Sequence, residues 1–449
     1  MDKSKKQKRI PSHRKAASSK WDKFYSFKLV LKSLGPGVIT GASDDDPSGI
    51  ATYSQAGAQF GLGMLWMTLF QYPLMTVIQE ICARIGLVTG SGLGRVLKRK
   101  YSKKVVFPIA GLLLIANTIN IGADIGAMAA SVRLIIPQLP MVVVTLSFTS
   151  FILASEILIP YDKYVRILKY FTLFLFTYLL TTIIVGGDIT KIIYSSIIPH
   201  IEFTKEYAMM FVAVLGTTIS PYLFFWQASE EAEEDVAKHK IKDIGKGKPK
   251  VTKSEVKLMR SDVAIGMAFS LSIMWSIIIT TAGSLHLNGI TDIQTADQAA
   301  KALEPLVKSF PYSGEIAEII FALGIIGTGL LAIPVLAGSC AYALSDVFGW
   351  KEGLNKKFNK AKSFYLIISL ATVVGLGINF VNIDPIKALI YTAVINGTVA
   401  VPILFAIMKI ANDKKILQDK TNSTLYNIIG WLAFGLMGIA VVIMLSTWS

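Results

Sequence analysis

The sequence DDDPSG, residues 44–49, lies inside an otherwise apolar stretch that runs from about Leu34 to Ala58. One aspartate at the centre of a membrane-spanning helix costs about 2.5–3.5 kcal/mol on insertion scales, so three adjacent aspartates are strongly disfavoured in lipid. Pro47 removes a backbone donor, and the serine and glycine after it offer little resistance to unwinding. Unwound backbone at membrane depth must be buried in protein or line a watery cavity. The stretch therefore predicts a cation site on a broken membrane helix.

The composition places this break in a polytopic membrane protein. Of the 449 residues, 53% are hydrophobic and only 17% are charged, which is unlike the usual soluble domain. Apolar windows of about 20 residues, each long enough to cross a bilayer, recur along the chain and predict an all-α fold with about eleven membrane helices. The predicted helices lie near residues 34–58, 62–87, 105–131, 139–159, 167–186, 206–229, 263–286, 316–346, 363–381, 386–409 and 425–446.

The positive charges are unevenly distributed between the loops. If the N-terminus is cytoplasmic, nearly all of the 45 Lys and Arg residues fall in the N-terminal tail and in the loops that face inside. This is the positive-inside pattern. It predicts an integral protein of the plasma (cell) membrane with its C-terminus outside. The net charge of +15 then reflects basic loops beside anionic lipid, and no nucleic-acid partner is expected.

A second discontinuity, GTTISPY at residues 216–222, interrupts the sixth predicted helix. A glycine, three hydroxyl residues and a proline weaken a helix at its midpoint. Helices 1 and 6 begin two blocks of five, and paired interruptions at corresponding places point to an inverted-repeat transporter with its site between them. The predicted organisation is a basic cytoplasmic tail, two five-helix repeats and an additional C-terminal transmembrane helix, over residues 1–32, 33–204, 205–411 and 412–449.

The longest predicted inner loop covers residues 230–260 and begins with the acidic run EEAEED. Charge runs of this kind are usually solvated, so we interpret the segment as a solvated linker rather than a regulatory segment. Glu230 and Glu231 then belong to a solvated helix end, the alternative being that they gather ions at the inner mouth.

At the two interruptions the chain resembles the NRAMP family of divalent-metal transporters, which have the leucine-transporter fold. The family carries Asp-Pro-Gly-Asn in helix 1 and a Gln-Ala-Gly-Ala stretch after it. Here DPSG stands at residues 46–49 and QAGA at 55–58. GPG at 35–37 and ARIGLVTG at 83–90 also match, and the similarity covers roughly residues 33–411. The resemblance implies an inverted 5+5 repeat with broken helices 1 and 6.

The departures from the family pattern concern its metal ligands, which are the Asp and Asn of helix 1 and a Met sulfur and an Ala carbonyl of helix 6. Asp46 is retained and Gly49 replaces the Asn. Ser220 replaces the Met, while Thr217 replaces the Ala and keeps a carbonyl. A thioether favours transition metals, whereas magnesium binds oxygen ligands and keeps several waters. The pattern is similar to the NRAMP-related magnesium transporter branch, which implies magnesium and manganese as cargo.

Tyr222 stands where the proton-coupled members of the family have a histidine. Tyrosine, with a pKa near 10, does not relay protons at neutral pH as imidazole does, so we expect weak or absent proton coupling. Uptake does not require coupling, because a divalent ion gains about 4.6 kcal/mol on entering across a 100 mV membrane potential.

Further candidate residues lie on helices 1, 3 and 10. Asn120 and Asp124 share one face of helix 3. Asn120 is a candidate for lining the access route or for a water-mediated contact, and Asp124 is either a second carboxylate for a hydrated ion or part of a structural hydrogen-bond network. Asp45 either lines the outer approach and binds water or caps exposed amides at the break. Asn396 either contacts bound water or serves packing.

We therefore expect a transporter that takes up magnesium and manganese by alternating access. A proton-coupled manganese or iron importer of the NRAMP type is an alternative that must explain the missing Met and His. A sodium-coupled organic-solute symporter of the same fold is another, disfavoured by the three aspartates, and a non-transporting sensor is a third. An enzyme is not expected, because no His-rich cluster, nucleophile motif or phosphate loop is present in the sequence. The expected partners are the metal ion and the bilayer, with no cofactor and no obligate protein partner.

Overall fold

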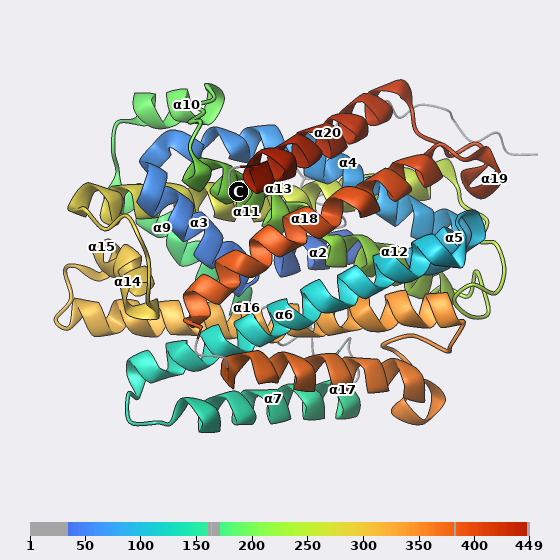
Figure 1. Ribbon diagram of the computed structural model, residues 1–449, viewed down its shortest axis with the longest axis horizontal. Helices are drawn as coiled ribbons and strands as arrows, with labels where there is room; N and C mark the ends of the chain where they lie inside the picture. The colour runs from blue at the N-terminus through green and yellow to red at the C-terminus, as the bar shows by residue number, and fades with distance from the viewer. Residues whose placement is uncertain (1–34, 160–162, 164–170, 381–382, 447–449) are drawn as a thin grey trace, which may run out of the picture. The chain divides into compact units, whose positions relative to one another are not determined.

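The computed structural model describes residues 35–159, 163, 171–380 and 383–446, and the described chain from Pro36 onward forms one unit (Figure 1). Its regular structure in these residues is helical, apart from an isolated β-bridge between Asp243 and Lys246. The predicted all-α fold is therefore confirmed. The basic tail over residues 1–32 lies outside the described residues.

Each predicted membrane segment has a helical counterpart. Helix 1 is divided into α2 (Pro36–Asp44) and α3 (Pro47–Phe60), and helix 6 into α11 (Lys205–Thr218) and α12 (Pro221–Ala237). The predicted fifth helix is a 3-10 turn, η2 (Phe171–Leu175), followed by α9 (Phe176–Val185), and its first residues lie outside the described part. The other long helices are α4 (Trp66–Thr89), α6 (Lys103–Ile135), α7 (Met141–Leu158), α13 (Lys253–Ser284), α16 (Ser313–Phe348), α17 (Lys362–Leu376), α18 (Pro385–Ala411) and α20 (Thr424–Ser446).

Within the described residues, eight spans are individually long and apolar enough to cross a membrane, among them α11 and α12 taken together. A ninth is reached if α3, with the short 3-10 helix η1 (Gly61–Met64) that follows it, is joined to α4 across a bend of 108°. The break in helix 1 and the shortness of α9 explain why this number is below the eleven segments read from the sequence.

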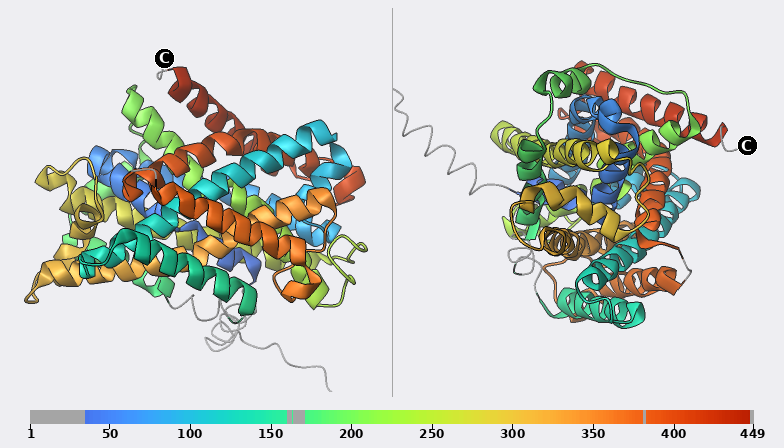
Figure 2. Two further views of the ribbon diagram at one scale, coloured as in Figure 1. Left: turned by 60° about the horizontal axis from the view of Figure 1, so that its bottom comes forward. Right: turned by 90° about the vertical axis from the view of Figure 1, so that its left-hand side faces the viewer.

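The packing relates the two blocks of helices to each other. α13 packs against both halves of broken helix 1, while α4 packs against α12 of broken helix 6. α6 packs along α16, and α7 and α17 lie side by side at one edge of the bundle against α6 (Figures 1 and 2). Each block thus supplies a broken helix that the other block surrounds, as the predicted inverted repeat requires.

The two breaks share one local design. α2 ends at Asp44 and α3 begins with Pro47 at its first position; α11 ends at Thr218 and α12 begins with Pro221. Proline is favoured at the first position of a helix, because the amide it lacks has no intrahelical partner there. Two residues of non-helical backbone therefore separate each pair of half-helices.

The basic loops gather at one end of the bundle. α5 (Leu93–Lys100), α19 (Lys414–Leu417) and the end of α12 lie there, whereas α10 (Ile189–Ile197), α14 (Ala296–Ala300) and α15 (Glu304–Val307) lie at the opposite end (Figure 1). Ion pairs and backbone bonds join the basic loops, for example Lys100 with Asp413. The described loops that the charge pattern assigns to one side of the membrane are thus brought together.

The interpretation of EEAEED as a solvated helix end is wrong. α12 continues to Ala237, and Glu231, Glu233 and Asp235 are buried. Glu231 accepts a hydrogen bond from Gln227 over 3.0 Å, and Glu233 accepts one from the backbone amide of Leu354 over 2.7 Å. Glu231 is therefore bonded within α12 and Glu233 to a later segment, and the loop that follows α12 is shorter than predicted, residues 238–252.

Candidate functional site

Asp46 lies in the break of helix 1 as the N-cap of α3, with extended backbone dihedrals. Its Oδ1 accepts hydrogen bonds from the Ser48 hydroxyl over 2.6 Å and from the Gly49 amide over 2.8 Å. Its Oδ2 accepts from the Asn120 side-chain amide of α6 over 3.0 Å. The carboxylate is 1% exposed and sits at the positive end of the α3 dipole, so local backbone geometry and one neighbouring helix fix its position.

Gly49 leaves little free space in this conformation. A Cβ atom there would lie 3.3 Å from the Asp44 carbonyl oxygen and 3.3 Å from Cε2 of Tyr53, and 3.6 Å from Oδ1 of Asp46. A side chain at this position would therefore reach the Asp46 carboxylate and would also press on the Tyr53 ring. The absence of a side chain at Gly49 leaves these three contacts unmade, and the role of Gly49 toward an ion stays a prediction.

The break in helix 6 presents a hydroxyl and a carbonyl that bond to each other. Ser220 donates to the carbonyl oxygens of Thr217 over 2.6 Å and Gly216 over 2.7 Å. The Thr217 hydroxyl lies 3.1 Å from the hydroxyl of Tyr53 on α3. Thr217 and Ser220, the two predicted ligands of helix 6, are thus bonded to each other at the break. Tyr53 connects this break to α3 of helix 1.

Asp124 is fully buried on α6, one helical turn from Asn120. Neither of its carboxylate oxygens has a hydrogen-bond partner among the described residues, and Oδ1 of Asn120 is also unpartnered there. Burying such groups without a partner is costly. The face of α6 predicted from residue spacing therefore turns toward the break in helix 1, with unused oxygen atoms.

Asp44 and Asp45 are buried against α13. The Ser270 hydroxyl donates to Oδ2 of Asp44 over 2.6 Å and lies 3.2 Å from Oδ1 of Asp45. The other oxygen of each carboxylate has no partner in the part of the chain that is described. Asp45 therefore does not line an open approach in this conformation, and its role toward an ion stays a prediction.

Asn396 is buried on α18, which packs against α3 and α11, and neither of its side-chain polar atoms has a described partner. Among the described residues, no three His, Cys, Asp or Glu side chains are grouped to hold a metal ion. An ion at these breaks would therefore need hydroxyl, amide or carbonyl oxygens beside the carboxylates. Hard cations accept such mixed oxygen ligands.

Several residues at the breaks are missing from the sequence prediction. Tyr53, Ser270 and the Thr40–Gln227 hydrogen bond between α2 and α12 all contact the broken helices. Each is a common polar residue on an apolar helix, and only its neighbours across the bundle give it a role. The one signal in the sequence that could have identified them is a hydroxyl or amide side chain within a predicted membrane helix.

Two half-helix pairs that meet in the middle of a bundle, with buried carboxylates at one break, define a membrane transporter of the leucine-transporter fold. The sequence profile described as "Natural resistance-associated macrophage protein-like" matches residues 37–447. The chain belongs to this family, Nramp, whose members are transporters and not enzymes.

Relatives support the same assignment. The chain is 24% identical over 428 residues to a protein of Klebsiella pneumoniae (strain 342) named "Divalent metal cation transporter MntH", with 94% of both chains covered. It is similar in fold to the Eremococcus coleocola manganese transporter, with a TM-score of 0.70 at 16% identity, covering 98% of this chain and 88% of that one. It is also similar to Mhp1, a nucleobase-cation-symport-1 family transporter, with a TM-score of 0.56 at 11% identity, covering 92% and 93% of the two chains.

Proposed function

We propose that this protein carries divalent metal cations across the plasma membrane by alternating access, with magnesium and manganese as its cargo. Membership of the Nramp family and the names of the relatives support the metal cargo. The choice of magnesium and manganese rests on the residues at the two breaks.

The observation that carries this proposal is the chemistry of the oxygen donors. Three of the proposed donors lie at α3 and α6: the carboxylates of Asp46 and Asp124 and the side-chain carbonyl of Asn120. Helix 6 adds the backbone carbonyl of Thr217 and the hydroxyl of Ser220. Ser220 occupies the position at which the NRAMP motif has a sulfur ligand. Oxygen donors of mixed charge suit magnesium and manganese, and a missing thioether removes a preference for softer metals.

The burial of Asp46 supports a transport cycle in which the site opens alternately to the two sides of the membrane. On one side of Asp46, Tyr53 of α3 meets Thr217 of α11. On the other side, the Tyr222 hydroxyl of α12 donates to the Ser43 carbonyl of α2 over 3.1 Å. Because the carboxylate is buried between these two contacts, an ion reaches it only when one of them opens.

Weak or absent proton coupling is the second part of the proposal. Tyr222 follows the helix 6 proline, where proton-coupled relatives carry histidine, and its hydroxyl is committed to a backbone carbonyl. A phenol does not exchange protons at neutral pH as imidazole does.

The domain organisation and orientation belong to the same proposal. We assign two five-helix repeats over residues 33–204 and 205–411, an additional helix within 412–449, and a cytoplasmic tail over 1–32. The gathering of the basic loops at one end supports a cytoplasmic N-terminus and an outside C-terminus.

The test is uptake of magnesium and manganese into proteoliposomes with the internal pH recorded. Asp46→Asn keeps the shape of the side chain and removes its charge, and we expect it to abolish uptake of both metals. Asp188→Asn is the matched control, because Asp188 caps α10 by the same kind of bond in an exposed position, and Asn caps equally well. Uptake by Asp46→Asn at the native rate would refute the site, and acidification in step with metal entry would refute uncoupled transport.

A further inference from the structure

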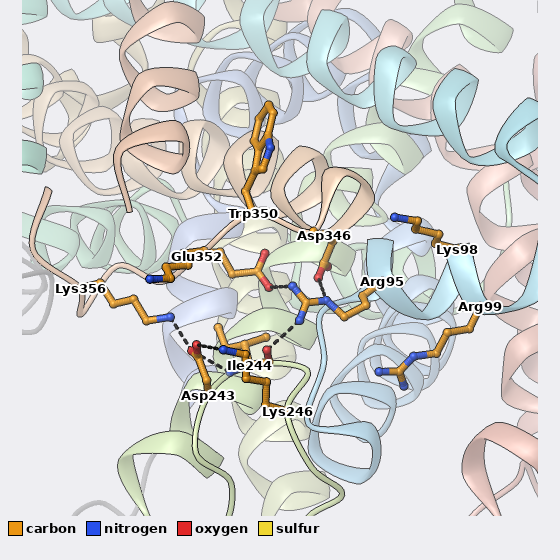
Figure 3. Close-up of a pocket in the computed structure, with 12 residues that line it drawn as sticks. Arg95, Lys98, Arg99, Asp243, Ile244, Lys246, Asp346, Trp350, Glu352 and Lys356 are labelled. Atoms are coloured by element: carbon orange, nitrogen blue, oxygen red, sulfur yellow. Dashed lines mark hydrogen bonds and ion pairs between the residues drawn. The ribbon is translucent and has the colours of Figure 1, made fainter. Parts of the chain in front are cut away.

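A cavity of about 600 Å³ lies at the basic end of the bundle, between α5, the linker 238–252 and the segment 349–361 that joins α16 to α17 (Figure 3). It is separate from the breaks in helices 1 and 6. Three carboxylates contribute to its wall: Asp243, Asp346 and Glu352. Six cationic side chains do so as well: Arg95, Lys98, Arg99, Lys246, Lys351 and Lys356.

The carboxylates of the cavity are already paired with three of the cations, Arg95, Lys246 and Lys356. Arg95 reaches Asp346 with its Nε over 3.1 Å and Glu352 with Nη2 over 2.6 Å, and its Nη1 donates to the Ile244 carbonyl over 2.7 Å. In Figure 3 these side chains meet at the centre of the cavity wall. Lys356 pairs with Oδ1 of Asp243 on the other side, and the Nζ of Lys246 lies 3.5 Å from Oδ2 of Asp243. These ion pairs join the segments that form the wall, and they neutralise the negative charges of its carboxylates.

The other cations keep most of their donors. Lys98 donates one hydrogen bond to the Val347 carbonyl over 2.7 Å, and Arg99 donates one to Ser91 over 3.1 Å. Lys351 has no ion-pair partner within the described ranges. Partial burial lowers the pKa of Arg99, and the neighbouring charge of Arg95 adds to the effect. The cavity thus presents unmatched ammonium and guanidinium groups.

An exposed aromatic cluster adjoins the cavity. Trp350 stacks on Phe348 with ring centroids 4.7 Å apart, and Phe107 of α6 meets Phe348 edge-on at 5.5 Å. All three rings are exposed, and they lie at the ends of membrane helices. Aromatic side chains in such positions are typical of the level of lipid headgroups.

We propose that the cavity between α5, the linker 238–252 and the segment 349–361 binds the phosphate group of an anionic phospholipid. Lys98, Arg99 and Lys351 contact the phosphate, and the acyl chains lie along Phe107 and Phe348. Basic pockets at the ends of membrane helices recognise headgroups in this way, and charge-assisted bonds to phosphate are strong. The assignment to the cytoplasmic leaflet rests on the proposed orientation.

The test is native mass spectrometry of the purified full-length protein titrated with phosphatidylglycerol or phosphatidylcholine in detergent. The variant K98Q/R99Q/K351Q neutralises three cations of the cavity. The control K253Q/K257Q/K414Q neutralises three exposed lysines that do not line it. With roughly fivefold for each cation near a phosphate, we expect about 100-fold weaker phosphatidylglycerol binding for the cavity variant, native binding for the control, and no saturable phosphatidylcholine binding.

Equal loss in the two triple variants would refute the cavity as the site. Displacement of the lipid by millimolar inorganic phosphate would show a soluble phosphate as the ligand and overturn the lipid assignment. If the triple variant fails to fold, K351Q alone, on an exposed segment, should bind about fivefold more weakly. No metal is present in this experiment, so its failure is distinguishable from failure of the transport proposal.

Discussion

The side-chain amide of Asn120 on α6 donates a hydrogen bond over 3.0 Å to Oδ2 of Asp46, the residue that caps α3. This bond joins the break in helix 1 to a long continuous helix of the bundle. It orients one carboxylate oxygen, while the Ser48 hydroxyl and the Gly49 amide orient the other. The rotation of Asp46 is therefore fixed before any ion arrives.

Asn120→Ala removes this support. We expect the free energy of unfolding to fall by about 1.5–3 kcal/mol, because a hydrogen bond to a carboxylate is lost and a buried oxygen is left without a donor. Chemical denaturation in detergent measures the change. Thr118→Ala, on a half-buried position of the same helix that lines an apolar surface, is the control and should change stability by less than about 0.5 kcal/mol. An equal loss in both variants would mean that the Asp46 bond adds nothing.

Asp124→Asn separates a structural role from a role in metal binding. Neither oxygen of Asp124 has a partner among the described residues, so neutralising it should leave the metal-free protein as stable as before or more stable. Stabilisation by magnesium should decrease at the same time, since the free energy that a ligand adds rises with the logarithm of its affinity for the folded state. Melting curves with and without magnesium give both quantities. A large loss of stability without metal would instead identify Asp124 as part of a structural network.

Ser220→Met restores sulfur at the helix 6 break and should raise the affinity for cadmium relative to magnesium. Adding Gly49→Asn should strengthen the effect only if the Tyr53 ring moves, because a Cβ at position 49 lies 3.3 Å from it. Competition of cadmium with manganese uptake measures the change. Unaltered cadmium competition in Ser220→Met would argue that residue 220 does not reach the ion.

Two conservative changes should open the site in opposite directions. Tyr222→Phe removes the bond to the Ser43 carbonyl between α12 and α2. Thr217→Val removes the bond to Tyr53 between α11 and α3 but keeps the Thr217 carbonyl. Loss of about 1 kcal/mol from one closed contact shifts the population about fivefold. Hydrogen exchange should increase in α2 and α12 for the first variant and in α3 and α11 for the second, so each is the control for the other.

The contact between Lys100 and Asp413 predicts a pH dependence. The hydrogen bond from Lys100 lowers the pKa of Asp413 below its ordinary value. A carboxyl whose pKa is lower in the folded state contributes stability above its unfolded pKa, near 3.9, and loses it as the pH falls through the folded value. The difference in melting temperature between the native protein and Lys100→Gln should therefore shrink as the pH falls from 6 to 3. Lys414→Gln, also next to Asp413 but outside this pair, should show no such trend.

Both helix breaks could be predicted from the sequence because each is determined by a short run of adjacent residues. An acidic run or a hydroxyl run followed by proline is unfavourable as membrane helix wherever it stands, and Pro47 and Pro221 mark the starts of α3 and α12. The spacing of Asn120 and Asp124 likewise predicted one face of α6. These inferences need only the period of a helix and the chemistry of single residues.

Contacts across the bundle were not predictable in the same way. The contact of Asp44 and Asp45 with Ser270 depends on how unwound backbone rotates, and helical periodicity does not describe that rotation. The burial of Glu233 depends on the Leu354 amide that a later segment brings, whereas Glu231 accepts from Gln227 of its own helix. A charge run has the same sequence appearance whether water or a neighbouring loop satisfies it.

The prolines that open α3 and α12 have a consequence for the empty carrier. Neither Pro47 nor Pro221 has an amide hydrogen, and each ring would clash with a preceding carbonyl in an uninterrupted coil. The two helix breaks are therefore a consequence of covalent structure, and the helices do not become continuous when the ion leaves. The breaks in helices 1 and 6 are therefore present when the carrier returns without an ion. Binding or release of the ion changes the net charge at the site between the two breaks.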